Sequence, residues 1–177
     1  MVIRGYGDLV KPFGVFMCNC DTDITALKKK ITALEEENLL LKNIIHKAPI
    51  PIFVLDRFHK IIHFNQALEE LSGFQAEDMI GTRHQWKAFY ARKRPVMADL
   101  IIDDAPDEHI IDLYGPKYKK AVSNKKLFAA TDFFSDLPPS GKWLLFSAAA
   151  VFDSKGNIAG AVETLQDVTP EKTKEQD

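Results

Sequence analysis

Aromatic and basic residues alternate within one short stretch of the sequence, TRHQWKAFYARKRP at residues 82–95. An aromatic ring offers a flat face for stacking, and an arginine guanidinium offers paired N–H donors that match a carboxylate. The stretch therefore favours a site for a small planar or carboxylate-bearing ligand, and the candidate ligand-binding residues are His84, Trp86, Tyr90 and Arg94. The alternative is structural, because aromatic residues at helical spacing commonly pack in a core while the arginines face solvent.

The histidine and cysteine positions predict no metal site. Cys18 and Cys20 are alternate residues, and two thiols are fewer ligands than a zinc site or a disulfide framework needs. His59 and His63 are four residues apart, but they flank a predicted strand turn rather than one face of a helix. We therefore expect no bound metal ion, and we interpret the cysteines as apolar side chains in a reducing compartment.

Catalytic motifs are missing from the sequence, which contains no glycine-rich phosphate loop, nucleophile elbow or H-E-x-x-H motif. We therefore expect a protein that is not an enzyme. The formal net charge of -2 gives no basic field for nucleic acid, so no nucleic-acid partner is expected. The N-terminus has no signal-peptide pattern, and the longest apolar run, WLLFSAAAVF, is too short to span a bilayer. These features predict a cytoplasmic chain without a membrane span.

A heptad repeat runs through residues 24–48 and predicts a parallel coiled coil that makes the chain a homodimer. The predicted dimer interface consists of Ile24, Leu27, Ile31, Leu34, Asn38, Leu41 and Ile45. Isoleucine at position a with leucine at position d favours two parallel strands, and a single asparagine at a, here Asn38, fixes register and oligomeric state. The flanking e and g charges are opposite in sign. The alternative is an amphipathic helix that lies against its own domain.

Two β-hairpins are predicted at the two ends of the region that follows this helix. Two prolines end the helix, and residues 52–64 then form a first hairpin, whereas residues 142–169 form a second. Asn65 is a favourable N-cap for a short helix that Gly73 ends. Within residues 82–140 the pattern predicts a short helix in DEHIIDLYG and a helical face of aromatic residues. Strands at both ends with helices between them predict an α+β fold, an antiparallel sheet with helices on one face.

The stretches PIFVLDRFHKIIHFNQALEELSGFQAEDMIGT and GNIAGAVETLQDVTPEK resemble the opening and closing parts of the PAS family of sensor domains. The likeness covers about residues 49–172 and is weakest in the middle. It implies a PAS-like sensor domain at residues 49–169, preceded by the linker helix at 24–48 and followed by the start of an output helix at 170–177.

The stretch CDTDITALKKK near the N-terminus is similar to LQDVTPEKTKE near the C-terminus, because both contain Asp-x-Thr followed by helix-forming residues. If the second is the exit of a PAS-like domain, the first is the exit of a preceding one. We therefore interpret residues 1–23 as an N-terminal strand or arm, a remnant of an upstream PAS-like module. The alternative is that any strand followed by a helix can be capped with aspartate or threonine.

The resemblance implies a sensor that recognises a small molecule or a partner and relays a change through its flanking helices. The output domain, for example a kinase, a cyclase or a transcription regulator, is not in this chain. No cofactor is identified: flavin photochemistry through a cysteine is excluded because no cysteine follows Cys20, and haem is disfavoured because His84 and His109 are more simply surface or hydrogen-bonding residues. The alternative function is a non-catalytic dimerisation or protein-interaction module without a small ligand.

Overall fold

The computed structural model describes residues 20–115, 118–120, 127–138 and 140–174. It divides the chain into two units, Met1–Leu40 and Leu41–Asp177, and the boundary falls inside the first helix. The proposed strand at residues 1–19 lies outside the described residues.

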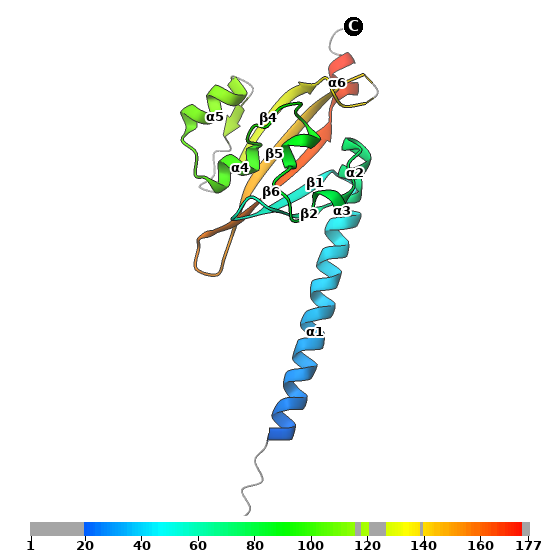
Figure 1. Cartoon of the computed structure of the whole chain (residues 1–177), viewed down its shortest axis with the longest axis vertical. Coiled ribbons are helices and arrows are strands. Elements are labelled where there is room, and N and C mark those ends of the chain that lie inside the picture. Colours follow the sequence, from blue (N-terminus) through cyan, green and yellow to red (C-terminus); the bar gives the residue numbers. More distant parts are fainter. Residues whose placement is uncertain (1–19, 116–117, 121–126, 139, 175–177) are drawn as a thin grey trace, which may run out of the picture. The chain divides into compact units, whose positions relative to one another are not determined.

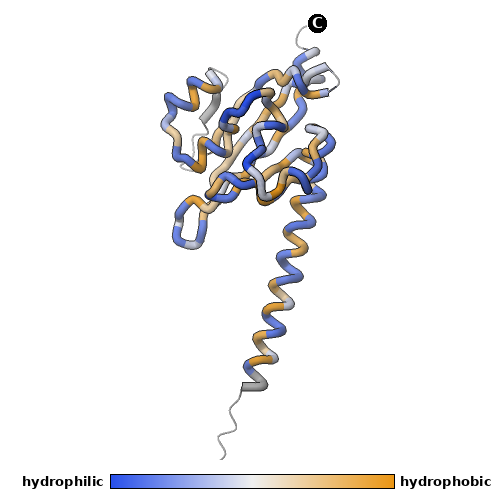
Figure 2. The backbone as a smooth tube through the Cα atoms, in the orientation of Figure 1, coloured by the Kyte–Doolittle hydropathy of each residue, from blue (hydrophilic) through white to orange (hydrophobic). Residues whose placement is uncertain are grey.

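Helix α1 (Cys20–Lys47) is 28 residues long. It begins four positions before the predicted start at Ile24, so residues 20–23 belong to the helix and not to a strand. It ends just before the two prolines, as their missing N–H groups require. Figure 2 shows apolar residues recurring along α1 between hydrophilic ones.

Six antiparallel strands form one sheet in the order β2-β1-β6-β5-β4-β3. The strands are β1 (Ile52–Asp56), β2 (Ile61–Phe64), β3 (Tyr118–Lys120), β4 (Leu127–Phe134), β5 (Lys142–Phe152) and β6 (Ile158–Asp167). Figure 1 shows β1, β6, β5 and β4 side by side. The first strand of the sheet therefore pairs with the last, and Ile52 of β1 lies opposite Thr164 of β6.

The helices that follow β2 are short. They are α2 (Gln66–Ser72), α3 (Ala76–Met79), the 3-10 helix η1 (Gln85–Ala88), α4 (Met97–Ile102), α5 (Asp107–Tyr114) and, after the last strand, α6 (Thr169–Lys174). Helix α4 packs against β1, β5 and β6 at the centre of the sheet. It therefore holds the segment before it, residues 82–95, beside the sheet.

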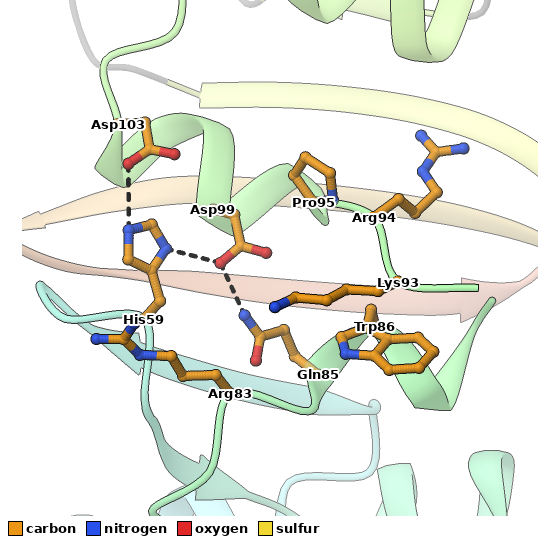
Figure 3. A pocket seen from close by; sticks show the side chains of 9 residues that line it. All are labelled: His59, Arg83, Gln85, Trp86, Lys93, Arg94, Pro95, Asp99 and Asp103. Carbon is orange, nitrogen blue, oxygen red and sulfur yellow. Dashed lines mark hydrogen bonds and ion pairs between the residues drawn. The ribbon is translucent and has the colours of Figure 1, made fainter. Parts of the chain in front are cut away.

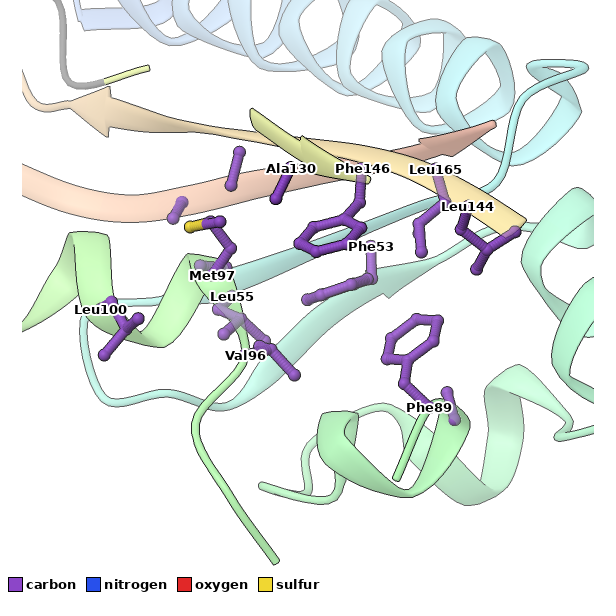
Figure 4. Close-up of a cluster of buried hydrophobic side chains, with 14 of the residues drawn as sticks. Phe53, Leu55, Phe89, Val96, Met97, Leu100, Ala130, Leu144, Phe146 and Leu165 are labelled. Atoms are coloured by element: carbon purple, nitrogen blue, oxygen red, sulfur yellow. The ribbon is translucent and has the colours of Figure 1, made fainter. Parts of the chain in front are cut away.

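The inner face of the sheet and the buried sides of these helices form a single hydrophobic core (Figure 4). Aromatic rings run through it: Phe89 lies 6.0 Å from Phe53 and 5.9 Å from Phe134, and Phe134 lies 5.9 Å from Phe146, all between ring centroids. Side chains thus fill the space between sheet and helices with close aromatic contacts. The predicted α+β fold, with helices on an antiparallel sheet, is confirmed.

Asn65 is the N-cap of α2, as predicted, and its side chain does more than cap. It is 1% exposed. Its Oδ1 accepts hydrogen bonds from the backbone N–H groups of Leu68, at 3.1 Å, and Ile52, at 2.8 Å. Its Nδ2 donates to the carbonyl oxygens of Ala48, at 3.2 Å, and Ile50, at 2.8 Å. One amide thus joins the end of α1, the start of β1 and the start of α2.

The middle of the chain contains elements that the pattern did not predict. Helix α5 lies where DEHIIDLYG predicted it, but α4, β3 and β4 were missed. The aromatic face expected in residues 86–90 belongs to the single 3-10 turn of η1 and the loop after it, not to an α-helix. Strand β4 mixes small and polar residues with its phenylalanines, so its alternation is weak in the sequence.

Candidate functional site

A pocket of about 420 Å³ opens between the β1–β2 turn, η1 and α4. Figure 3 shows the residues that line it: His59, Arg83, Gln85, Trp86, Lys93, Arg94, Pro95, Asp99 and Asp103. Most of these side chains are polar or charged, and most come from the segment that the sequence singled out. Pockets for small molecules in proteins typically start at about 300 Å³. The volume is therefore sufficient for a small organic ligand.

Asp99 organises one wall of this pocket. Its Oδ2 accepts a hydrogen bond from the backbone N–H of Val96 at 3.0 Å, which caps α4. Its Oδ1 accepts from Nε2 of Gln85 at 2.7 Å and lies 2.8 Å from Nδ1 of His59. The other ring nitrogen of His59 lies 3.1 Å from a carboxylate oxygen of Asp103. The β1–β2 turn is thereby tied to both ends of α4.

Three polar atoms in this region are buried and have no hydrogen-bond partner among the described residues: Oε1 of Gln85, Nε1 of Trp86 and Nε of Arg94. Buried polar groups are nearly always paired, so unpaired ones require an explanation. All three belong to residues that line the pocket. A molecule in the pocket with a donor and an acceptor would supply partners for Oε1 of Gln85 and Nε1 of Trp86.

The predicted ligand-binding residues are only partly brought together. Trp86 and Arg94 line the pocket. Tyr90 does not line it, although the Arg94 guanidinium lies 4.3 Å from its ring centroid, and burial raises the pKa of Tyr90 to about 12. Arg94 also donates to the Leu113 carbonyl oxygen at 3.3 Å. His84 is exposed and is not among the residues that line the pocket.

Sequence reasoning missed several residues of this pocket. Gln85, Lys93 and Asp99 lie in or close to the chosen stretch, but their types alone gave no signal. His59 was considered only as a metal ligand, and its link to Asp99 joins residues 40 positions apart. Asp99 stands three residues after the N-cap of α4, but Val96 is not a capping residue, so the Ser/Thr-x-x-Glu pattern that marks many helix starts is absent here.

Glu163 of β6 is a buried carboxyl group on the inner side of the sheet. It is 3% exposed, and its Oε2 accepts a hydrogen bond from the Ala98 backbone N–H at 2.9 Å. Burial raises the pKa of Glu163 to about 8; the Ala98 hydrogen bond opposes this and the Asp99 carboxylate adds to it. Tyr90 and Tyr114 also face this carboxyl group. At neutral pH the protonated form of Glu163 is favoured.

We expect the stability of this protein to fall as the pH rises from about 4.5 to about 8, the interval between the ordinary and the folded-state pKa of Glu163. In that interval the folded state holds a proton that the unfolded state releases, so this group contributes at most about -1.4 kcal/mol per pH unit to the free energy of unfolding. Glu163→Gln keeps an acceptor for Ala98 and removes the titration. Urea denaturation across this range should therefore show a flatter pH profile for the variant, and parallel profiles would contradict the prediction.

The junction between β6 and α6 is held by the residues of the Asp-x-Thr motif. Asp167 accepts a hydrogen bond from the Thr169 backbone N–H at 3.0 Å and forms an ion pair with Lys142 at 2.6 Å. The Thr169 hydroxyl, at the first residue of α6, accepts from the Trp143 backbone N–H at 2.9 Å. The motif thus attaches the start of α6 to the neighbouring strand β5.

The predicted dimer positions on α1 are open to solvent in the single chain. Exposed fractions are 48% for Ile24, 59% for Leu27, 54% for Ile31 and 63% for Leu34. Asn38 and Leu41 are also exposed, whereas Ile45 is half-buried. Apolar side chains this exposed on one face favour a partner surface. Outside the heptad seam, Leu39, Leu40 and Ile44 are exposed as well.

Two further expectations concern metals and membranes. In the part of the chain that the structure describes, no group of three or more histidine, cysteine, aspartate or glutamate residues is arranged to hold a metal ion. None of the helices formed by the described residues has the length and apolar character needed to cross a bilayer.

In a comparison with protein families, the family described as PAS fold matches residues 45–173. A comparison with curated proteins gives no match. The match spans all six strands, the short helices between β2 and β3, the last residues of α1 and most of α6.

Several solved structures are similar to this chain at low sequence identity. An RNA-binding light-oxygen-voltage receptor is 19% identical with a TM-score of 0.50, over 77% of this chain and 35% of that one. The PAS domain of BvgS from Bordetella pertussis is 15% identical with a TM-score of 0.48, over 79% of this chain and 94% of that domain. The PAS domain of an HTR-like protein from Haloarcula marismortui is 16% identical with a TM-score of 0.48, over 79% and 98%. The chain thus spans about a third of the receptor.

Proposed function

Because the chain belongs to the PAS fold family, we propose that it is a sensing module that recognises a small molecule and passes a conformational change through its flanking helices. PAS domains are in general sensor or interaction modules and are typically not catalytic. The observation that supports sensing best is the pocket beside α4, in which buried polar atoms of Gln85 and Trp86 have no partner among the described residues. A ligand that pairs with these atoms would change the hydrogen bonding of η1 and α4.

The route from this pocket to the flanking helices is short. Asp99 couples the pocket to α4, which packs on β1, β5 and β6. Strand β1 follows soon after α1, and the Asn65 side chain holds this junction by a hydrogen bond to Ile50. Strand β6 leads into α6, and Asp167 holds that junction by a hydrogen bond from Thr169. A small displacement of α4 against the sheet would therefore reach both ends of the domain. The output domain, such as a kinase, a cyclase or a transcription regulator, would then receive it through these helices.

The proposed working form is a parallel homodimer joined along α1. Support comes from the heptad, from the asparagine at position a, and from the exposure of the leucine and isoleucine side chains on that face. The two helices would lie in register, so that a change in one sensor domain affects the other along the shared axis.

A second candidate function is a dimerisation or protein-interaction module that holds no small ligand. One observation favours it: the space between the sheet and the helices is filled by the rings of Phe53, Phe89, Phe134 and Phe146. In that case the pocket beside α4 would hold only water, and the exposed apolar face of α1 would be the functional surface.

Native mass spectrometry of the intact purified chain tests the proposal, because it measures stoichiometry and occupancy together. We expect a dimer that retains a small molecule, and we expect Trp86→Ala to lose this molecule while remaining dimeric. Trp143→Ala is the matched control, since Trp143 is also partly buried but lies outside the pocket. A dimer without any retained mass would favour the interaction module, and a strictly monomeric chain would contradict both proposals.

A further inference from the structure

We propose that the pocket beside α4 binds an organic anion: a carboxylate or phosphate group attached to a planar ring that carries a hydrogen-bond donor. This inference rests on the proposed sensing function and specifies the ligand class for the same pocket. It follows from three features of the pocket as the described residues form it: positive charges without a partner, a buried acceptor without a donor, and an indole beside them.

The unpaired charge in the pocket is positive. Its two carboxylates are already engaged, because Asp99 accepts from Val96 and Gln85 and both Asp99 and Asp103 contact the His59 ring. In contrast, Arg83 and Lys93 make no hydrogen bond or ion pair with any described residue. Figure 3 shows the Lys93 chain running along the pocket rather than out of it. Two cations without a partner in the described part of the chain suit an anionic group.

The third cation of the pocket is not available for this role. The Arg94 guanidinium lies 4.3 Å from the ring centroid of Tyr90 and 5.1 Å from that of Tyr114. It also donates to the Leu113 carbonyl oxygen. In Figure 3 its guanidinium turns away from Asp99 and Gln85. Arg94 therefore shapes the wall, and Arg83 and Lys93 are the residues assigned to the anion.

Gln85 specifies the donor on the ligand. Its side chain is buried, with the residue 4% exposed, and its Nε2 donates to Asp99 at 2.7 Å. Because the carboxylate can only accept, this contact fixes which end of the amide is the nitrogen. Oε1 is consequently a buried acceptor with no donor among the described residues. A hydroxyl or N–H group on the ligand would complete it.

Trp86 and Pro95 specify the planar ring. Both line the pocket, and they provide its aromatic and apolar surface beside the charged groups. The indole N–H of Trp86 is buried without an acceptor within the described part of the chain. An oxygen of the anionic group is the acceptor it lacks. A single substituted ring is within the size that the cavity of about 420 Å³ holds.

The test uses four probes and the fluorescence of Trp86 in the full chain carrying Trp143→Phe, which leaves Trp86 as its one tryptophan. The probes are 4-hydroxybenzoate, 4-hydroxyphenyl phosphate, the neutral 4-hydroxybenzamide and 4-methoxybenzoate, which lacks the donor. We expect one or both hydroxylated anions to bind with a Kd below about 1 mM. The amide and the methoxy compound should bind at least about tenfold more weakly. The tighter of the two anions identifies carboxylate or phosphate.

Three variants assign the contacts. Arg83→Ala with Lys93→Ala should weaken the anions at least about tenfold and leave the amide unchanged. Arg92→Ala is the matched control, since Arg92 is an exposed cation of the same segment outside the pocket. Gln85→Leu should abolish the preference for hydroxyl over methoxy, a ratio that does not depend on stability.

The inference is overturned if the amide binds as tightly as the anions, or if none of the probes changes Trp86 fluorescence at about 10 mM, about tenfold above the expected Kd. These outcomes are distinguishable from failure of the sensing function. If the probes fail in this way but native mass spectra show a retained small molecule, the sensing function stands and this ligand class is rejected. A chain that retains no molecule and binds no probe would reject both.

Discussion

Asn65→Ala is expected to lower the free energy of unfolding by about 3 kcal/mol or more. The substitution removes both the N-cap of α2, about 1 kcal/mol, and the partners of three further backbone groups, at about 1–3 kcal/mol for each one left buried and unpaired. Those groups belong to Ile52, Ala48 and Ile50, at the point where α1 passes into the sheet. Urea denaturation followed by circular dichroism measures the loss.

Two variants make this prediction specific. Asn65→Asp keeps the acceptor for Ile52 and Leu68 but removes the donors, so we expect it to recover part of the stability. Asn43→Ala changes an exposed asparagine on α1 and should alter stability by less than about 0.5 kcal/mol. If Asn65→Ala were as mild as Asn43→Ala, the four hydrogen bonds would not be structurally important.

Leu34→Asp is expected to weaken the proposed α1 dimer by at least about 1000-fold in Kd. It removes an apolar side chain from the centre of the seam and places two carboxylates opposite each other, and the loss of about 1.5–3 kcal/mol per buried leucine in each of two chains accounts for most of the effect. Asn38→Lys should weaken the dimer as well, because it sets two ammonium groups against each other at the same layer. Sedimentation velocity over a concentration series measures both.

Leu40→Asp is the matched control for this prediction. Leu40 is 60% exposed and Leu34 is 63% exposed, but Leu40 lies at heptad position c, outside the seam. Equal weakening by both variants would show that a broader apolar surface, including Leu39 and Ile44, joins the chains. A parent chain that sediments as a monomer at all concentrations would contradict the coiled coil altogether.

Local signals predicted the ends of the domain well. Asn65 and Gly73 bracket α2 because a side-chain acceptor and a left-handed residue are what helix ends require; Gly73 has a φ of 76°. The hairpins β1–β2 and β5–β6 follow from two β-rich runs joined by polar turns. In each case the information lies within a few residues of the element it determines.

The candidate site could be predicted only in part, because most of its contacts join distant residues. Trp86 and Arg94 were found from composition, but His59 enters the pocket only because the β1–β2 turn folds onto α4. Nothing in the sequence marks Gln85 as a pocket residue, because its role depends on the hydrogen bond from its Nε2 to Asp99, which leaves Oε1 for the proposed ligand. Glu163 reads in sequence as an ordinary polar residue of an alternating strand, and only the packing of α4 over β6 makes it buried.

The pairing of Ile52 with Thr164 also determines how the domain resists tension. Because β1 and β6 are antiparallel neighbours, the chain enters one strand and leaves the other at the same end of the sheet. A pull on the two chain ends would load the hydrogen bonds between these strands one after another, as in opening a zipper, rather than all at once. A domain connected in this way unfolds at low force, beginning with the hydrogen bonds between β1 and β6 nearest Ile52.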